Sequence, residues 1–343
     1  MLRIAHLSDI HLKTDSLDDI DNFIMKALIK DLARHHSEKE IDLIIISGDL
    51  IDKGGESFES IDVAYQMFNK HIIAPLIKDL NIPTSRIFLA PGNHDVDRKA
   101  DNIYVEKGLR GELTSIEKVN EYFSKENCDG NKRIIPYKRF ERSFYKEYPS
   151  EHSVTDFHSV FKVQLSNMAI GLTSFNSAWR AYDSTTDKGL LIVGEKQIID
   201  ARKLIDACDV TIAIMHHTDE WLSEFERKRI SGFLARDYQM LLCGHAHEGT
   251  VCSKTDMYGS LFVSVSPASL TGQIRGTDRF HSNGYSIIDY DLSSMRITNH
   301  NRRYSYQKEC YDPNTDLGDE NGRLYFNIPD SVSLTKQSEE SKT

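Results

Sequence analysis

Apolar residues occur in short continuous runs that alternate with longer stretches of helical spacing. The runs at residues 2–7, 43–47 and 86–90 have the length and composition of buried strands. Residues 18–35 and 61–80 place apolar side chains at intervals of three and four. This spacing predicts two helices, the second broken or kinked near Pro75. Such alternation predicts an α/β sheet with parallel strands, in which ligands bind beyond the carboxyl ends of the strands.

The second half of the chain predicts another sheet. Its expected strands are residues 159–165, 168–174, 210–215, 238–242, 261–265, 285–290 and 296–303, with helices at 195–207 and 225–234. Residues 1–95 and 157–305 are therefore assigned to one domain. Residues 96–156 are charged and aromatic with weaker periodicity, which predicts an inserted helical cap. Residues 306–343 form a C-terminal extension, and its polar end, residues 330–343, is predicted to be a disordered tail.

Composition narrows the class of protein. The chain is 39% hydrophobic and 27% charged, as in ordinary globular proteins, and its formal charge is −10. The acidic balance argues against a protein that coats nucleic acid through bulk positive charge. No run approaches the ~20 apolar residues that span a bilayer, and the N-terminal segment lacks the features of a signal peptide. The five cysteines are scattered, so we expect reduced thiols and a cytoplasmic location without membrane association.

Ligand-type residues follow five of the predicted strands. Carboxylate, carboxamide and imidazole groups together suit Mn²⁺, Fe²⁺, Ni²⁺ or Zn²⁺, and not a thiolate zinc site. In extended backbone, Asp-x-His and His-x-His would direct both side chains to one side, while a preceding glycine permits close approach. Each segment alone is a weak signal, but five in order predict a metal site: Asp9-x-His11, Gly48-Asp49 followed by Asp52, Gly92-Asn93-His94-Asp95, His216-His217 and Gly244-His245-Ala246-His247.

These segments resemble the signature of the calcineurin-like metallophosphoesterases: D-x-H, G-D-x-x-D, G-N-H-D, a strand-ending H and G-H-x-H, over residues 4–291. The resemblance implies a two-sheet β sandwich flanked by helices, the αββα fold, with a dinuclear metal centre. It implies that Asp9, His11 and His247 hold one metal, that Asn93, His216 and His245 hold the other, and that Asp49 bridges them. His216 is preferred to His217 because the first histidine after the strand takes this place in the family. Relatives often have proline after this pair, where this chain has Thr218.

The resemblance also implies a mechanism. Two cations about 3.5–4 Å apart lower the pKa of a bridging water, so that it supplies hydroxide near neutral pH, and they clamp phosphate oxygens. His94 is the residue expected to stabilise or protonate the leaving oxygen, with Asp52 or Asp95 as orienting partners. Candidates for contact with substrate are Arg98, Asn176, Arg180 and His217. Mn²⁺ is the favoured ion at both metal positions.

Three functions are compatible with the sequence. The opening residues 4–12 look most like the bacterial cyclic-nucleotide phosphodiesterase branch, which predicts a phosphodiesterase for a small nucleotide or other phosphodiester. Two divalent cations beside Asp9 and Asp49 would leave a cationic centre in an acidic protein, which favours such a compact substrate. A nuclease is the second hypothesis. The third is a regulatory subunit that retains the metal site and binds a protein partner through its cap or C-terminal extension.

The nuclease hypothesis depends on residues 132–146. This segment has six basic residues, one acidic residue and four aromatics, a composition found in contacts with single-stranded nucleic acid. The favoured interpretation is an amphipathic cap helix with Phe140 and Phe144 buried and the charges in solvent.

Overall fold

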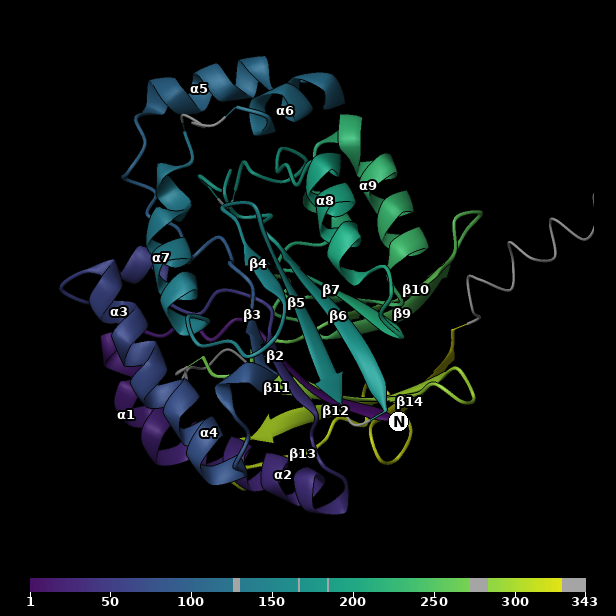
Figure 1. Cartoon of the computed structure of the whole chain (residues 1–343). Coiled ribbons are helices and arrows are strands. Elements are labelled where there is room, and N and C mark those ends of the chain that lie inside the picture. The colour runs from purple at the N-terminus through teal and green to yellow at the C-terminus, as the bar shows by residue number, and fades with distance from the viewer. Residues whose placement is uncertain (126–129, 166, 184, 272–282, 329–343) are drawn as a thin grey trace, which may run out of the picture.

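Two β-sheets packed face to face form the centre of the computed structural model, which describes residues 1–125, 130–165, 167–183, 185–271 and 283–328 (Figure 1). The first sheet has the order β13-β12-β11-β1-β2-β3, and β14 also pairs with β12. Its strands are β1 (Leu2–Leu7), β2 (Leu43–Ile46), β3 (Ile87–Leu89), β11 (Gly284–Asp291), β12 (Arg296–Ser305), β13 (Cys310–Pro313) and β14 (Arg323–Asn327).

The second sheet has the order β4-β5-β6-β7-β8-β10-β9. Its strands are β4 (His152–Val154), β5 (His158–Leu165), β6 (Met168–Phe175), β7 (Val210–Met215), β8 (Met240–Cys243), β9 (Thr250–Thr255) and β10 (Ser260–Val265). Strands β1, β2 and β3 run parallel, as do β6, β7, β8 and β10, whereas the remaining pairs are antiparallel. The strands that lead into the predicted ligands, β1, β2, β3, β7 and β8, are all among these parallel strands.

The core has two parts, which follow from the alternation of side chains along each strand. From β1, Leu2 and Ile4 point into the layer between the sheets, together with Ile212 of β7. Ala5 and Leu7 belong to the layer beneath the helices. The predicted two-sheet sandwich flanked by helices is therefore confirmed.

Helices cover the outer faces of both sheets (Figure 1). On the side of the first sheet, α1 (Leu17–Asp19) continues through residues 20–24 into α2 (Met25–Glu38), and α3 (Ile61–Phe68) continues through residues 69–73 into α4 (Ala74–Leu80). Each junction is a short π-helical segment, and the second one precedes Pro75, where the sequence predicts a break. On the side of the second sheet lie α8 (Glu195–Ile205) and α9 (Glu224–Asp237).

The segment predicted as a cap contains α5 (Ile103–Glu112), α6 (Ile116–Phe123) and α7 (Ile135–Phe144). It also contains β4, which pairs with β5, so the second sheet begins inside residues 96–156. In the same way, β13 and β14 of the predicted C-terminal extension enlarge the first sheet. These three strands have at most five residues each, too few to show a clear alternation in the sequence. The predicted disordered tail lies outside the described residues.

The basic segment is folded into the protein. Phe140 of α7 is buried and stacks on Tyr65 with ring centroids 4.5 Å apart, and Phe144 packs partly against the core. The expectation that the charges of this segment lie in solvent is wrong for Arg133 and Lys138, which are buried.

Burial of these two cations is possible because each meets an acid. Arg133 Nη1 donates to Glu106 at 2.6 Å, while Lys138 pairs with Glu141 on the same helix. Two exposed cations of the segment, Arg139 and Arg142, pair with Asp62 and Asp156. Most of the positive charge that motivates the nuclease hypothesis is thus balanced within the protein.

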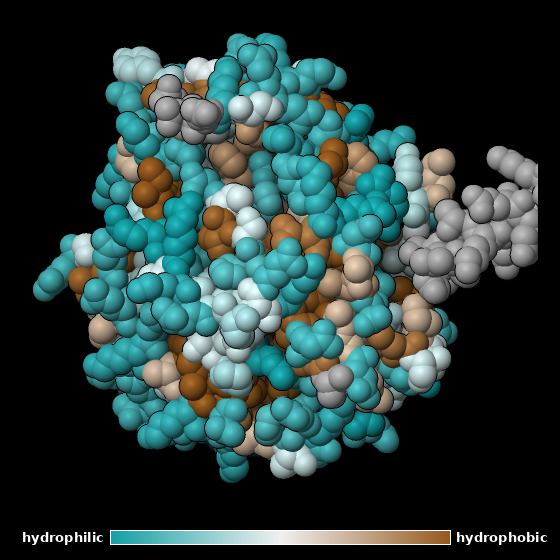
Figure 2. Space-filling model, in the orientation of Figure 1, coloured by the Kyte–Doolittle hydropathy of each residue, from teal (hydrophilic) through white to brown (hydrophobic). Residues whose placement is uncertain are grey.

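The surface seen in Figure 2 is mostly hydrophilic, with apolar side chains interspersed. Among the helices of the described part of the chain, none has the length and apolar composition needed to cross a membrane. The cysteines that the structure describes are free thiols.

Candidate metal centre

The seven predicted ligands lie together where the carboxyl ends of β1, β2, β3, β7 and β8 meet. The loops that carry them are joined by hydrogen bonds. Asp9 N donates to Gly48 O at 3.0 Å, which ties the end of β1 to the end of β2. His245 N donates to Asp9 Oδ2 at 2.9 Å, which links the first sheet to the second. The site therefore lies across one end of the sandwich.

Asp9, His11 and His247 form one group of potential ligands. The Nε2 atoms of His11 and His247 are 3.1 Å apart and lie 3.6 and 3.3 Å from Asp9 Oδ1. His11 Nε2 is also 3.6 Å from Asp49 Oδ2. Atoms bound to one ion at about 2.0–2.1 Å lie roughly 3 Å or slightly more from one another. These spacings suit a single ion, with Asp49 within reach.

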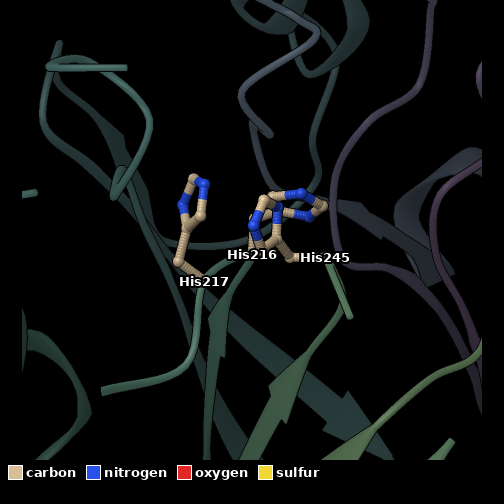
Figure 3. Close-up of side chains that lie close together, drawn as sticks. All are labelled: His216, His217 and His245. Carbon is tan, nitrogen blue, oxygen red and sulfur yellow. The ribbon is translucent and has the colours of Figure 1, made fainter. Parts of the chain in front are cut away.

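The second group contains Asn93, His216 and His245, and Asp49 approaches it from the other side. His216 Nε2 lies 3.2 Å from Asp49 Oδ2, and His245 Nδ1 lies 2.9 Å from Asn93 Oδ1. His216 Nδ1 donates to Ser47 O at 2.7 Å, which directs Nε2 toward Asp49. The rings of His216 and His245 lie close together, with centroids 5.3 Å apart (Figure 3). Asp49 thus lies between the two groups, the place expected of a bridging ligand.

Two buried ligand atoms show that this set of donors fits a cation. Asp9 Oδ1 and His216 Nε2 are inaccessible to solvent and have no hydrogen-bond partner of acceptable geometry. An unsatisfied buried polar atom is costly, and a metal ion would satisfy both. The mixture of carboxylate, amide and imidazole donors is the one expected for a divalent transition metal.

The electrostatics of the cluster favour positive charge. Burial alone would lower the pKa of His11, but the neighbouring carboxylates of Asp52 and Asp9 raise that pKa to about 10. For His216, burial is likewise outweighed by Asp49, and the pKa rises to about 9. Burial would raise the pKa of Asp49, yet the charge of His216 and its other histidine neighbours keep it well below the usual range. The carboxylates therefore stay ionised and attract cations.

The backbone at the ligands corrects one sequence-based argument. Extended backbone was expected to align the side chains of Asp9 with His11 and of His245 with His247. Instead, all four have positive φ angles of 52°, 47°, 72° and 57°, and Asp49 has a φ of 52°. The left-handed conformation is uncommon for residues other than glycine and typical of functional sites. The side chains converge because each strand ends in a tight left-handed turn.

Two of the predicted glycines are required by close approach. Gly48 has a φ of +106°, and a Cβ there would lie 2.5 Å from His216 Nδ1. A Cβ on Gly92 would lie 2.1 Å from Asp49 Oδ1 and 2.3 Å from Asp49 N. Both distances are far below a normal contact, so these positions admit no larger residue unless a ligand moves.

His94 lies beside the cluster, with its ring centroid 4.5 Å from that of His11. Its Nδ1 is 2.8 Å from Asp52 Oδ1. Because a carboxylate only accepts hydrogen bonds, Nδ1 carries the proton in this contact and Nε2 is directed away from Asp52. Of the two predicted orienting partners, Asp52 is the one that contacts the ring.

Asp95 has a different place. Its carboxylate accepts hydrogen bonds from the backbone N–H groups of Gly92, Leu50 and Ile51, at 2.8–3.2 Å. Burial and the nearby Asp49 raise the pKa of Asp95 to about 7. Asp95 therefore fastens the loops after β2 and β3 to each other and does not contact the His94 ring.

Two of the four residues predicted to contact substrate, His217 and Arg98, lie next to predicted metal ligands. His217 lies 4.5 Å from His245 between ring centroids, and its Nδ1 is 2.8 Å from Ser177 Oγ. Burial lowers the pKa of His217 well below its usual value. Arg98 Nη2 donates to the backbone O of Asn93 at 3.2 Å, which keeps the guanidinium next to a predicted ligand.

Asn176 and Arg180, also predicted to contact substrate, have hydrogen-bond partners within the protein. The Asn176 side chain donates to Asp156 O at 2.8 Å and accepts from Ala178 N at 3.1 Å, so both its ends hold the loop after β6. Arg180 is buried and donates to Glu106 Oε1 of the cap at 2.8 Å. Its charge is paired with Glu106, and this ion pair joins the cap to the second sheet.

Two aromatic residues near the site were not predicted as functional. Trp221, interpreted from the sequence as a packing residue, has its ring 4.1 Å from that of His245. Phe58 borders a cavity next to His94. The sequence signal for Phe58 is slight: it is an isolated aromatic residue shortly after the Gly48-Asp49 segment, in a turn without periodicity.

Comparisons with known proteins agree with this geometry. A family model described as calcineurin-like phosphoesterase matches residues 2–249. The chain is similar to the metallophosphoesterase-like protein YydB of Bacillus subtilis strain 168, with 22% identity over 260 residues. That match covers 73% of this chain and 49% of the relative, so the chain spans about half the length of that protein.

Solved structures with a similar fold include a dimetal phosphatase from Danio rerio, with 11% identity and a TM-score of 0.46. This match covers 88% of this chain and 96% of that one. Another is GAP50, the anchor in the inner membrane complex of Plasmodium, with 14% identity and a TM-score of 0.43. It covers 98% of this chain and 93% of that one.

Proposed function

This chain belongs to the calcineurin-like phosphoesterase family, and we propose that it is a metal-dependent phosphodiesterase for a small nucleotide or a similar phosphodiester, with Mn²⁺ as the working ion. The two groups of ligands around Asp49 support a dinuclear centre. Two divalent cations held there would lower the pKa of a bound water and neutralise the charge on phosphate oxygens.

Two cavities beside the ligand cluster favour a phosphodiester over a phosphomonoester as substrate. One, of about 500 Å³, is bordered by His94, and the other, of about 230 Å³, is bordered by the predicted ligand His247. A phosphodiester has two organic groups that need space next to the reacting phosphate, whereas a monoester has one. A cavity on each of these two histidines provides room for both groups.

The protein's own residues have distinct tasks in this proposal. His94 Nε2 would protonate the leaving oxygen, while Asp52 holds Nδ1 and so keeps the ring in place. Arg98, held beside Asn93, would contact the phosphate or the leaving group. His217, held by Ser177 next to His245, would contact the substrate from the other group of ligands.

The test is hydrolysis of bis-p-nitrophenyl phosphate by Mn²⁺-loaded protein, compared with the monoester p-nitrophenyl phosphate. We expect a higher kcat/KM for the diester. Asp49→Asn should reduce activity at least 10²-fold, because it weakens the ligand shared by both groups. Asp62→Asn is the matched control, since Asp62 is an exposed aspartate on α3 that pairs with Arg139.

Three results would contradict the proposal. They are a preference for the monoester, absence of turnover with Mn²⁺, Fe²⁺, Ni²⁺ and Zn²⁺ alike, or equal activity of the Asp49→Asn and Asp62→Asn variants when both are folded. Circular dichroism and thermal unfolding of each variant establish the last condition.

A further inference from the structure

The cavity next to His94 has a wall that is fixed to this residue. The wall comes from residues 53–61 and from residues 97–99, with His94 between them. Gly54 N donates to His94 O at 2.7 Å, and Gly55 N donates to Asp52 O at 2.8 Å. The residue placed to protonate the leaving oxygen and the wall of the adjoining cavity are thus parts of one hydrogen-bonded unit.

The backbone of this wall is tightly wound. Lys53, Gly54 and Gly55 have consecutive positive φ angles of 44°, 63° and 77°. A lysine in this conformation is strained, and such strain is kept only where the surrounding structure enforces it. The result is a turn that brings the next aromatic residue, Phe58, to the cavity that His94 borders.

Phe58 has the surroundings of a stacking platform. It is partly buried, because it packs against the hydrophobic core beneath the turn, and it also borders the cavity. Its backbone N–H donates to Gly55 O at 2.9 Å, which fixes the residue to the wound turn. An aromatic ring held in this way offers a π surface to a flat ring at little entropic cost.

The charges that line the cavity are balanced. Three cations and three acids line it: Lys53, Arg98 and Lys99, and Glu56, Glu59 and Asp97. Within this set, Lys99 pairs with Glu56 at 3.0 Å. A cavity with this balance gives no net advantage to a group that carries its own phosphate or ammonium charge. It is rich in hydrogen-bonding groups, which suits a neutral alcohol with several polar atoms.

We propose that this cavity binds the leaving group of the substrate and that the leaving group is a nucleoside, whose base stacks on Phe58. This inference rests on the proposed phosphodiesterase function. The aromatic wall selects a flat ring, the polar lining suits sugar hydroxyls and base edges, and the charge balance disfavours charged alcohols such as choline. At about 500 Å³, the cavity lies within the size range of sites for small organic ligands.

The experiment compares Phe58→Ala with the wild-type protein on a dinucleoside monophosphate and on bis-p-nitrophenyl phosphate, both with Mn²⁺. For the dinucleoside monophosphate we expect KM to rise about tenfold with kcat within threefold, because stacking is lost while the chemistry is intact. For bis-p-nitrophenyl phosphate, whose p-nitrophenyl ring is also flat, we expect KM to rise in the same direction while kcat stays within threefold of wild type. Phe58→Tyr should restore the KM for the dinucleoside monophosphate. Tyr104→Ala, at an exposed aromatic residue of α5, is the matched control.

The outcomes separate this inference from the function on which it rests. If wild-type protein does not hydrolyse bis-p-nitrophenyl phosphate, the proposed function fails. If it does so but prefers glycerophosphocholine to the dinucleoside monophosphate, only the nucleoside inference fails. An unchanged KM in Phe58→Ala, or an equal fall of kcat on both substrates, also overturns the inference.

Discussion

A single methyl group added at Gly92 should weaken metal binding while the protein still folds. Its φ angle is in the ordinary range, so Gly92→Ala introduces no left-handed strain and tests close approach alone. The new Cβ would lie 2.1 Å from Asp49 Oδ1 and 2.3 Å from Asp49 N. The side-chain oxygen could rotate away, but the backbone nitrogen could not.

The size of the effect follows from these contacts. Both are far shorter than a van der Waals distance, so the loops after β2 and β3 must separate, at about 1–3 kcal/mol of unfolding free energy. Asp49 moves with its loop, and Asp49 is the carboxylate shared by the two ligand groups. We therefore expect Mn²⁺ affinity to fall at least tenfold, which corresponds to about 1.4 kcal/mol.

The assay measures bound Mn²⁺ per chain by elemental analysis after equilibrium dialysis, together with urea unfolding of the metal-free protein. Gly108→Ala is the matched control, because Gly108 lies on α5 with no atom within 4 Å of the position of its Cβ. There the same substitution should raise stability by about 0.5–1 kcal/mol, since alanine is the better helix former.

If Gly92→Ala binds Mn²⁺ as tightly as the wild-type protein, close approach to Asp49 does not control metal binding. Equal loss of Mn²⁺ affinity in both alanine variants would contradict such control as well, because the effect would then not depend on contact with Asp49.

Two further predictions concern His94 and the pH dependence of stability. Asp52→Asn should lower kcat on bis-p-nitrophenyl phosphate about 10–100-fold with little change in KM, because the amide holds the His94 ring less firmly. Steady-state kinetics measure kcat and KM separately, and a change in KM alone would contradict this role of Asp52. Burial raises the pKa of Glu226 from 4.5 to about 7, although its carboxylate accepts from the N–H groups of Val193 and Gly194. The folded state thus holds this proton more tightly than the unfolded state, and the associated stability, complete below pH 4.5, is lost as the pH rises through 7. Urea unfolding from pH 5 to 8 should show the wild-type protein losing stability relative to Glu226→Gln, by up to about 3 kcal/mol over the whole interval, and a constant difference would contradict the assignment.

The clustering of the candidate ligands was predictable from the sequence, because their positions depend on strand topology, which leaves a clear pattern. Buried strands appear as apolar runs, and parallel strands end at the same edge, so polar residues after such runs meet there. Strand topology brings Asp9, His11, Asp49, His216 and His245 to one edge, and the left-handed turns then direct the side chains toward one another. The close approach at Gly92 was predictable for the same reason.

Tertiary contacts decide the features that were not predicted. The left-handed backbone at Asp9 and His11 is enforced by bonds from their N–H groups to Gly48 O and Asp49 O, on another strand's loop. Arg180 finds its partner Glu106 74 residues away, in a helix that shows no chemical motif. No local sequence pattern predicts such long-range pairs.

The central position of β1 in the first sheet has a consequence for biosynthesis. Its residue Ile4 pairs with Leu43 of β2 on one side and with Ile288 of β11 on the other. At translation rates of about 5–20 residues per second, roughly 15–60 s pass between synthesis of β1 and of its second neighbour. During this time one edge of β1 lacks its native partner strand and is open to wrong pairing. Although Asp9 is made among the first residues, the sheet that carries it is completed only after β11 has been synthesised.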